Sequence, residues 1–443
     1  MGFRTSLINS SKDVRLLWAS VFLRLLSYGL TNQVLTLFLN EIHLDEIKIG
    51  LFLSLTLVGD VLCSYILTWY ADTWGRRRVL IFGATMMMVS GLVFSYSESF
   101  SILLLLAIVG VISPSSDEVG PFKSIEEAML AHLTPHDSRP EIYALHAFFG
   151  TVGASLGAVI CGYFIYFVQL TKYGQTDLAC YKLVFLLYAF IAFLKVIVML
   201  SLSDHTELDG HHHEEVTSSE AFVVDETDPL LLETETVSSK DASRTFSKET
   251  SAIMKKLLII FMIDSLGSGF MTSGWMVFYY AKQFLMSAES LGLVFFVSKI
   301  VMAASTFPSS IIARAFGPVK ATLLVQIPSG LFSILIPFAE GSLPLSLVLL
   351  NLHFATTAMD VTPRQILLTN IIKPKDLTRV MGIVNIGKTM ARCIGPVFTG
   401  LLASSHYLWL CYIMSGIMVI LADFLLGLSF LDMDIKIMQR MSK

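Results

Sequence analysis

Long apolar runs recur along the whole chain and dominate its hydropathy pattern. Each run has about the ~20 residues that an α-helix needs to cross the hydrocarbon core of a bilayer. We place twelve such spans, at residues 15–40, 47–71, 79–97, 101–131, 141–168, 180–202, 255–281, 289–312, 319–338, 343–371, 379–403 and 406–431. The pattern predicts an all-α membrane protein with twelve transmembrane helices. In the fourth span we expect a break at the sequence SPSSDEVGP.

Composition narrows the class of protein further. Hydrophobic residues make up 54% of the chain, charged residues only 15%, and the mean hydropathy is +0.69. These values lie outside the range of soluble globular domains. The chain has no Walker loop, Gly-x-Ser-x-Gly, His-Glu-x-x-His or dinucleotide fingerprint. We therefore expect neither an enzyme nor an ATP-driven pump, and we expect no cofactor and no nucleic-acid partner.

Basic residues indicate the orientation, because they favour cytoplasmic loops. With twelve spans and both termini in the cytoplasm, most loop arginines and lysines fall on the cytoplasmic side, including Arg76, Arg77 and Arg78. The opposite side receives only Lys48, Lys172, Lys182 and Lys282. We therefore expect both termini to be cytoplasmic.

The chain changes character between residues 203 and 253, where it is acidic, rich in Ser and Thr, and poor in aromatic residues. Such a segment cannot bury enough apolar surface to fold. We expect a disordered cytoplasmic loop at 203–253, between an N-terminal six-helix bundle at 1–202 and a C-terminal six-helix bundle at 254–443. The run His211–His213 in this loop could bind zinc, but it lacks paired Cys/His spacing, and we predict no metal site.

The central loop also contains ETDPLL, which has the form of an acidic dileucine sorting signal. Its signal residues are Glu226, Leu230 and Leu231. The resemblance implies recognition by an adaptor protein and residence in a vacuolar or lysosome-like membrane, with the plasma membrane as the alternative.

Two cytoplasmic loops of the first half recur in the second half. Asp137 in HLTPHDSRPEIYALH aligns with Asp376 in IIKPKDLTRVMGIVN, 239 residues later. Gly75 in ADTWGRRR aligns with Gly317 in ARAFGPVK, 242 residues later. Two loops with nearly one offset indicate two pseudo-symmetric six-helix bundles, an architecture known among transporters.

The loop between the second and third spans, with this six-plus-six pattern, resembles the major facilitator superfamily. The motif of that family reads Gly-x-x-x-Asp-Arg-x-Gly-Arg-Arg/Lys. Its aspartate, later glycine and basic pair correspond here to Asp72, Gly75, Arg76 and Arg77. Thr68 and Thr73 replace its first glycine and first arginine. The resemblance implies the family's fold, a transport function, and a role of this loop as a conformational latch.

Ionisable residues inside the spans are the candidate functional residues, because each is costly in a membrane. As candidates for proton coupling we take Asp264, Glu126 and Asp60. As candidates for substrate binding we take Arg24, Asp360, Arg364, Lys388 and Arg392. Arg24 and Asp264 occupy equivalent places 240 residues apart, and we expect them to approach each other.

Simpler interpretations of these charges remain open. Asp360 and Arg364, or Lys123 with Glu126 or Glu127, could neutralise one another along a single helix. Lys195 and Asp423 lie near the ends of their spans, so that we expect them to extend toward the membrane surface.

The sequence favours a secondary active transporter that moves a small polar or charged solute by alternating access and is coupled to protons. So many buried charges disfavour a carrier of purely apolar compounds. Two alternatives are a drug/proton antiporter for lipophilic cations and a membrane sensor that binds a solute without transporting it. The expected partners are the solute, protons, the lipid bilayer and an adaptor protein.

Overall fold

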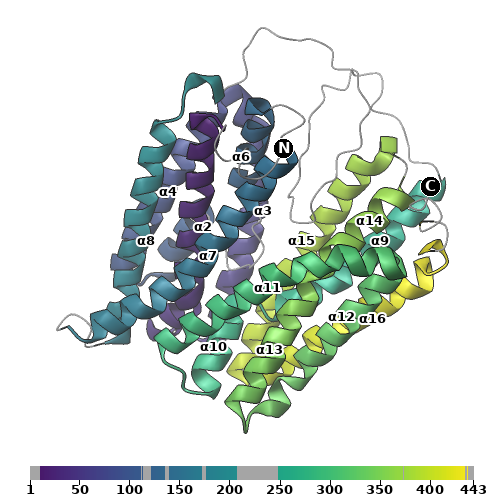
Figure 1. The fold of residues 1–443 in the computed structure, drawn as a ribbon. Helices are drawn as coiled ribbons and strands as arrows, with labels where there is room; N and C mark the ends of the chain where they lie inside the picture. Colours follow the sequence, from purple (N-terminus) through teal and green to yellow (C-terminus); the bar gives the residue numbers. More distant parts are fainter. Residues whose placement is uncertain are drawn as a thin grey trace. The chain divides into compact units, whose positions relative to one another are not determined.

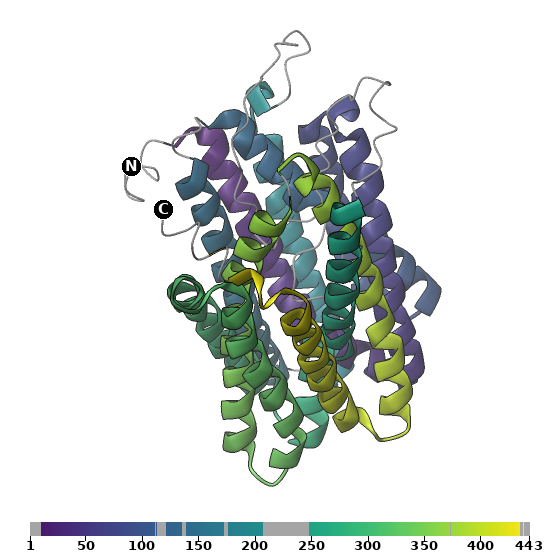
Figure 2. The same ribbon diagram turned by 90° about the vertical axis from the view of Figure 1, so that its right-hand side faces the viewer.

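The computed structural model describes residues 10–110, 112, 121–134, 139–171, 176–206, 248–372, 374–434 and 437. Every regular element in these ranges is a helix, as Figures 1 and 2 show from two directions. The first helices are α2 (Lys12–Glu41), α3 (Glu46–Trp74), α4 (Arg76–Tyr96), α5 (Phe100–Val109), α6 (Pro121–Leu133), α7 (Arg139–Gln169) and α8 (Asp177–Leu200). The later ones are α9 (Lys248–Phe270), α10 (Ser273–Gln283), α11 (Ala288–Phe316), α12 (Pro318–Leu335), α13 (Leu343–Ala358), α14 (Val361–Ile371), α15 (Pro374–Ser404) and α16 (Leu408–Phe430). Within the described residues the all-α prediction is confirmed.

Each predicted span corresponds to one helix or to two consecutive helices of the structure. Ten helical segments of the described residues are long and apolar enough to cross a membrane. The other two predicted spans are α5 with α6, and α15. α5 has only 10 residues, and α15 has ample length but carries Lys388 and Arg392, which lower its hydropathy. Hydropathy therefore located all twelve spans, although the helices extend beyond the apolar part of several of them.

Two spans that we predicted as continuous are interrupted. α9 and α10 are separated at Thr272, whose backbone is extended, and α13 and α14 are separated at Asp360. Pro363 lies in the first turn of α14, where its missing N–H group costs no helical hydrogen bond. In the fourth span α5 ends at Val109, and the expected break at residues 113–120 lies outside the described residues.

Glycines bring equivalent helices together in the two halves. A Cβ atom at Gly157 of α7 would lie 2.2 Å from the Leu26 carbonyl oxygen of α2, next to Gly29. A Cβ atom at Gly395 of α15 would lie 2.2 Å from the Gly269 carbonyl carbon of α9. Gly269 follows Gly29 by 240 residues, and Gly395 follows Gly157 by 238. The first and fifth spans of each half thus pack backbone to backbone, as small residues permit in membranes.

A left-handed glycine turn is also repeated. Gly75, between α3 and α4, has φ 95°, and Gly317, between α11 and α12, has φ 86°. Residues with a side chain rarely adopt such φ values, which explains glycine at both positions. The sequence alignment paired these same two residues, so the internal repeat is confirmed.

Spatial contacts divide the chain into two compact units. One comprises Met1–Thr217 with Thr272–Lys299, and the other comprises Ser218–Met271 with Ile300–Lys443. The division runs through the interruption between α9 and α10. Residues 207–247, most of the acidic segment, lie outside the described residues, so the predicted domain boundaries stay a prediction.

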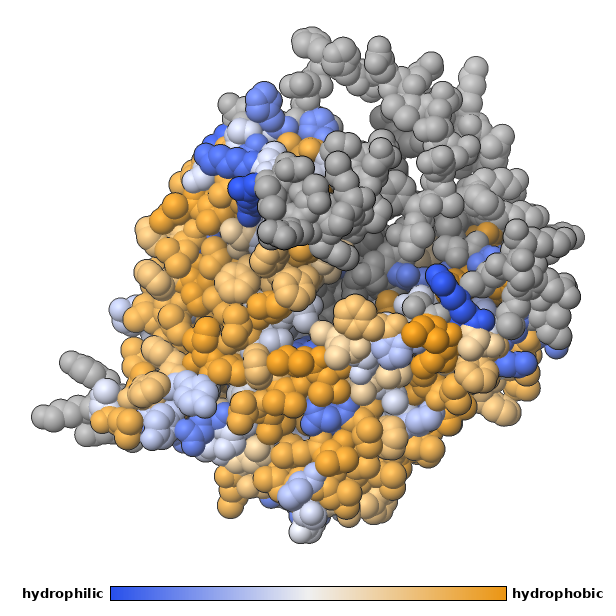
Figure 3. All heavy atoms as spheres, in the orientation of Figure 1, coloured by the Kyte–Doolittle hydropathy of each residue, from blue (hydrophilic) through white to orange (hydrophobic). Residues whose placement is uncertain are grey.

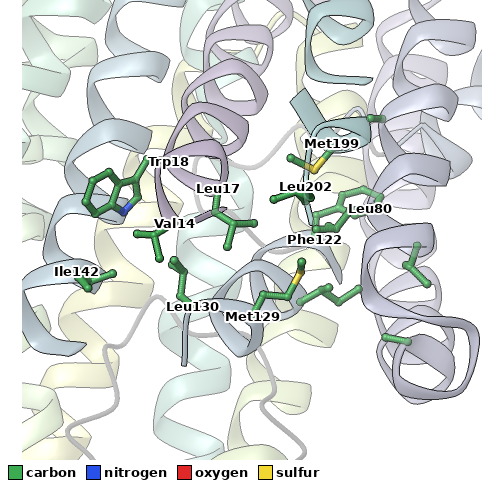
Figure 4. Packing of buried hydrophobic residues seen from close by; sticks show 14 residues of the cluster. Val14, Leu17, Trp18, Leu80, Phe122, Met129, Leu130, Ile142, Met199 and Leu202 are labelled. Carbon is green, nitrogen blue, oxygen red and sulfur yellow. The ribbon is translucent and has the colours of Figure 1, made fainter. Parts of the chain in front are cut away.

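Each unit has its own apolar core. In the first unit the core lies between α2, α4, α6, α7 and α8, and Figure 4 shows Val14, Leu17, Trp18, Phe122 and Met129 among its members. In the second unit the core includes Leu257, Phe261, Val319, Leu367 and Leu426.

Apolar side chains also cover much of the face that Figure 3 shows, where orange predominates. Phe307 is 78% exposed and Leu428 is 70% exposed, each in a helix long enough to cross a membrane. A soluble protein rarely exposes apolar surface on this scale. These faces are suited to contact lipid.

Candidate functional site

The Glu126 carboxylate, on α6, is the centre of a buried polar cluster that we call the Glu126 cluster. Its Oε2 accepts a hydrogen bond from Arg24 Nη2 at 2.5 Å, and its Oε1 accepts one from the Ser20 hydroxyl at 2.6 Å. His146 Nε2 lies 3.8 Å from Oε2, and Lys195 Nζ lies 3.9 Å from Oε1. The Glu126 side chain is 0% exposed, so protein groups take the place of water around its charge.

The Arg364 guanidinium, on α14, is the centre of a second cluster, the Arg364 cluster. Its Nη1 donates to Asp264 Oδ2 of α9 at 2.7 Å, and its Nε contacts Asp360 Oδ2. Gln326 of α12 donates to the same Asp360 oxygen at 2.8 Å. Asp423 of α16 is 1% exposed and lies within electrostatic range of Arg364. Several carboxylates therefore surround one guanidinium.

The two clusters occupy equivalent positions with opposite charges. Arg24 corresponds to Asp264, Glu126 to Arg364, and Lys195 to Asp423, at separations of 240, 238 and 228 residues. The elements correspond as well, since α2, α6 and α8 are the counterparts of α9, α14 and α16. The first half thus has a carboxylate between two cations, and the second half has a guanidinium between carboxylates at the equivalent position.

Two ion pairs join residues four positions apart in the chain, as one alternative interpretation of the charges expected. Arg364 and Asp360 form an ion pair at i,i+4 spacing. Lys123 Nζ lies 3.8 Å from Glu127 Oε1, also at i,i+4 spacing. Such local pairing does not account for the clusters, because Arg364 also contacts α9 and the partners of Glu126 come from three other helices.

Lys388 and Arg392 lie on one face of α15 in the second half. Both act electrostatically on Asp264, which places them near the Arg364 cluster. Lys388 Nζ lies 5.7 Å from the centre of the Phe261 ring, and the Arg364 guanidinium lies 5.2 Å from it. A ring face that attracts cations helps to hold these side chains inside the helix bundle.

Two expectations from the sequence, for Lys195 and Asp423, need correction. Lys195 and Asp423 do not extend to the membrane surface, because each is only 1% exposed. Their place on the last span of each half was the signal that could have identified them as counterparts, although their separation of 228 residues is shorter than the loop offsets of 239 and 242. Arg24 pairs with Glu126 and Asp264 pairs with Arg364, each within its own half, and the expected approach of Arg24 to Asp264 stays a prediction.

The arginines after Gly75 bind backbone carbonyl groups. Arg76 Nη1 donates to the Ala128 carbonyl of α6 at 3.3 Å, and Arg77 Nη2 donates to the Leu200 carbonyl of α8 at 2.8 Å. Arg78 is exposed. The side chain of Asp72 lies outside the described part of the structure.

The remaining candidates are Asp60 and residues outside the described ranges. Asp60, on α3, is 1% exposed and lies close enough to Cys63 to act on its thiol. The dileucine residues of the central loop and the run His211–His213 fall in the undescribed range 207–247.

Comparison with known proteins places the chain in a family. The family model described as Major Facilitator Superfamily matches residues 17–280 and 257–436. The chain belongs to the major facilitator superfamily. It is 67% identical over 438 residues to the uncharacterized membrane protein YJR124C of Saccharomyces cerevisiae, covering 98% of this chain and 97% of that protein. It is 26% identical over 103 residues to the quinolone resistance protein NorA of Staphylococcus aureus, covering 23% of this chain and 26% of NorA.

Solved structures of major facilitator proteins share the fold. A bacterial homologue of the human lysosomal transporter Spinster has a TM-score of 0.73 at 13% identity, covering 97% of this chain and 99% of that one. The D-xylose-proton symporter has a TM-score of 0.66 at 15% identity, covering 93% and 96%. The human organic anion transporter MFSD10 has a TM-score of 0.57 at 19% identity, covering 94% and 98%. This chain is therefore an integral, multi-pass membrane transporter with the all-α major facilitator fold.

The family's loop motif leads to a first testable expectation. If the loop is a conformational latch, Asp72→Asn and Arg76→Ala should leave insertion and abundance intact while sharply slowing transport. Arg78→Gln is the matched control, because Arg78 is exposed and two arginines remain to hold the loop in the cytoplasm. Transport rates and surface-normalised abundance measure both effects. Equal, mild effects from all three substitutions would show that the run only directs topology.

Proposed function

We propose that this major facilitator protein is a secondary active transporter that moves a small polar or charged solute by alternating access, coupled to protons. The observation that carries the proposal is the pair of clusters with opposite charges at equivalent positions inside the spans. A charged residue at the centre of a membrane helix costs about 2.5–3.5 kcal/mol on insertion scales. Two matched sets of such residues indicate that these charges are needed for function, because they lower the stability of the protein in the membrane.

The position of the Arg364 cluster supports a solute site. Asp360 lies at the interruption between α13 and α14, and Arg364 follows one turn later. Interrupted helices near the middle of the membrane are typical of the solute and ion sites of secondary transporters. Lys388 and Arg392 add positive charge from α15, and we assign them to an anionic part of the solute.

Asp264 is the proposed proton-coupling residue. Its side chain is 15% exposed, whereas that of Glu126 is 0% exposed, so water reaches Asp264 more readily. Its hydrogen bond with Arg364 stabilises the ionised form, and loss of that bond favours proton uptake. A rocking motion that breaks and restores the bond would therefore couple proton binding to conformation.

Similar proteins are consistent with this proposal at the level of chemistry. One structural neighbour is named as a proton symporter and another as an organic anion transporter. The similarity to NorA keeps the drug/proton antiporter as a second candidate, although it covers only 23% of this chain. The buried Arg364 of α14 and the half-buried Lys388 and Arg392 of α15 disfavour lipophilic cations as the solute.

The solute can be found by comparing compartments. Metabolites are measured in vacuole-like organelles and in whole cells, from a knockout strain and its parent. We expect one polar or charged compound to change in the organelle and to be transported by the purified protein in liposomes. Transport of lipophilic cations alone would favour the antiporter, and solute binding without flux would favour a sensor.

The second testable expectation concerns the membrane in which the protein resides. We assign the acidic dileucine form ETDPLL to sorting into a vacuolar or lysosome-like membrane through an adaptor protein. Leu230→Ala with Leu231→Ala should shift a fluorescently tagged protein to the cell surface. Leu232→Ala, next to the signal, is the control and should leave the distribution unchanged. An unchanged distribution of the double variant would exclude the signal.

A further inference from the structure

The Glu126 cluster contains two basic groups that approach the carboxylate without a hydrogen bond. Within the described residues, Lys195 Nζ has no hydrogen-bond partner, and its side chain is 1% exposed. Both ring nitrogens of His146 likewise lack a hydrogen-bond partner in this part of the chain, and its side chain is 4% exposed. A buried ammonium without a hydrogen bond is costly, so its position needs an explanation.

Glu126 itself already has close partners. Arg24 and Ser20, both from α2, hold its two oxygens at 2.5 and 2.6 Å. Lys195 Nζ from α8 lies 3.9 Å from Oε1, and His146 Nε2 from α7 lies 3.8 Å from Oε2. Arg24, Lys195 and His146 are the charged or titratable groups of the described residues whose action on Glu126 the structure shows. A shift of the carboxylate by about an ångström would bring it within hydrogen-bond distance of Lys195.

We propose that Lys195 is the reserve counter-ion of Glu126, with His146 as its second support. When Arg24 turns from Glu126 to an anionic group of the solute, the carboxylate moves to Lys195 and stays ionised. The role of Arg24 in binding the solute rests on the proposed function. The exchange of partners between Arg24 and Lys195 is a property of the first unit alone.

The reason for a reserve is the cost of an unpaired buried charge. Removing one partner of a buried ion pair typically costs ~3–5 kcal/mol, because the other charge remains in a low-dielectric environment. If Arg24 alone stabilised Glu126, recruiting Arg24 to a solute would incur that cost. Lys195, a second cation close to Glu126, lowers the cost of leaving this carboxylate without Arg24. Arg24 can then bind the solute and Glu126 alternately.

The test needs neither solute nor flux. Melting temperatures are measured for Lys195→Met in the wild-type and in the Arg24→Gln background, with Lys195→Arg as the conservative variant. We expect Lys195→Met to cause a larger loss of Tm in Arg24→Gln than in wild type, and Lys195→Arg to restore most of that loss. Lys123→Met is the matched control, because Lys123 pairs with Glu127, and its effect should be the same in both backgrounds.

Infrared spectra report whether Glu126 is ionised. We expect no band of a protonated Glu126 in Arg24→Gln, and its appearance in Arg24→Gln with Lys195→Met. Addition of Glu126→Gln should remove the band and so assign it. If Arg24→Gln cannot be purified, Arg24→Met replaces it, because methionine also removes the positive charge. A protonated Glu126 while Lys195 is intact, or equal effects of Lys195→Met in both backgrounds, would overturn the inference. Either result would leave solute transport itself untouched.

Discussion

Asp264→Asn is expected to abolish accumulation of the solute against its gradient while leaving exchange of solute at equal pH. Asparagine keeps the size of the side chain and can still accept a hydrogen bond from Arg364, but it cannot take up a proton. The wild-type carboxylate accepts that bond from Arg364 Nη1 at 2.7 Å. The substitution therefore removes the coupling step and preserves the local packing. Uptake into liposomes, with and without an imposed pH gradient, measures both activities.

Arg392→Gln is the comparison for this experiment. The Arg392 side chain lies near Asp264, and we propose that it binds an anionic part of the solute. Arg392→Gln should therefore weaken solute binding in both assays. The two variants thus separate proton coupling from solute binding. Accumulation by Asp264→Asn with the pH dependence of the wild type would place the proton site elsewhere, with Glu126 as the next candidate.

Gly395→Ala is expected to cause a severe loss of folded protein. The new Cβ atom would lie 2.2 Å from the Gly269 carbonyl carbon, and that contact is between backbones, so no side-chain rotation relieves it. Overpacking of a well-packed core typically costs about 1–3 kcal/mol, and a backbone clash lies at or above the upper end. Size-exclusion profiles and melting temperatures of the solubilised protein measure the loss.

Gly382→Ala, in the same helix, is the matched control. Among the described residues a Cβ atom at Gly382 has no neighbour within 4 Å, and alanine is the better helix former by roughly 0.8–1 kcal/mol. This variant should be as stable as the wild type or more so. Similar losses from both substitutions, or none from Gly395→Ala, would contradict the close packing of α9 and α15.

Much of the fold was predictable because the bilayer imposes one length and one polarity on every span. Hydropathy placed the twelve spans, and two loops gave the repeat through Gly75 and Gly317. The interruptions at Thr272 and Asp360 were not predicted, because the apolar pattern continues across both of them. They depend on local backbone contacts that a hydropathy average does not register.

The candidate site was predictable in membership but not in pairing. The cost of burial identified Arg24, Glu126, Asp264 and Arg364 as candidates, because ionised side chains rarely lie in spans without a function. Which of them meet depends on the rotation and depth of separate helices, and the sequence contains neither. Lys195 was missed for a related reason, since a position near a span end resembles a residue that reaches water.

The most direct test of proton-coupled transport is a measurement of proton movement that solute alone drives. Liposomes containing the purified protein and a trapped pH-sensitive dye start at equal pH on both sides, and the solute found in the organelle comparison is added outside. We expect a change of internal pH in the wild type that Asp264→Asn abolishes, although labelled solute still exchanges through this variant. Entry of the solute into wild-type liposomes without any change of internal pH would contradict this expectation.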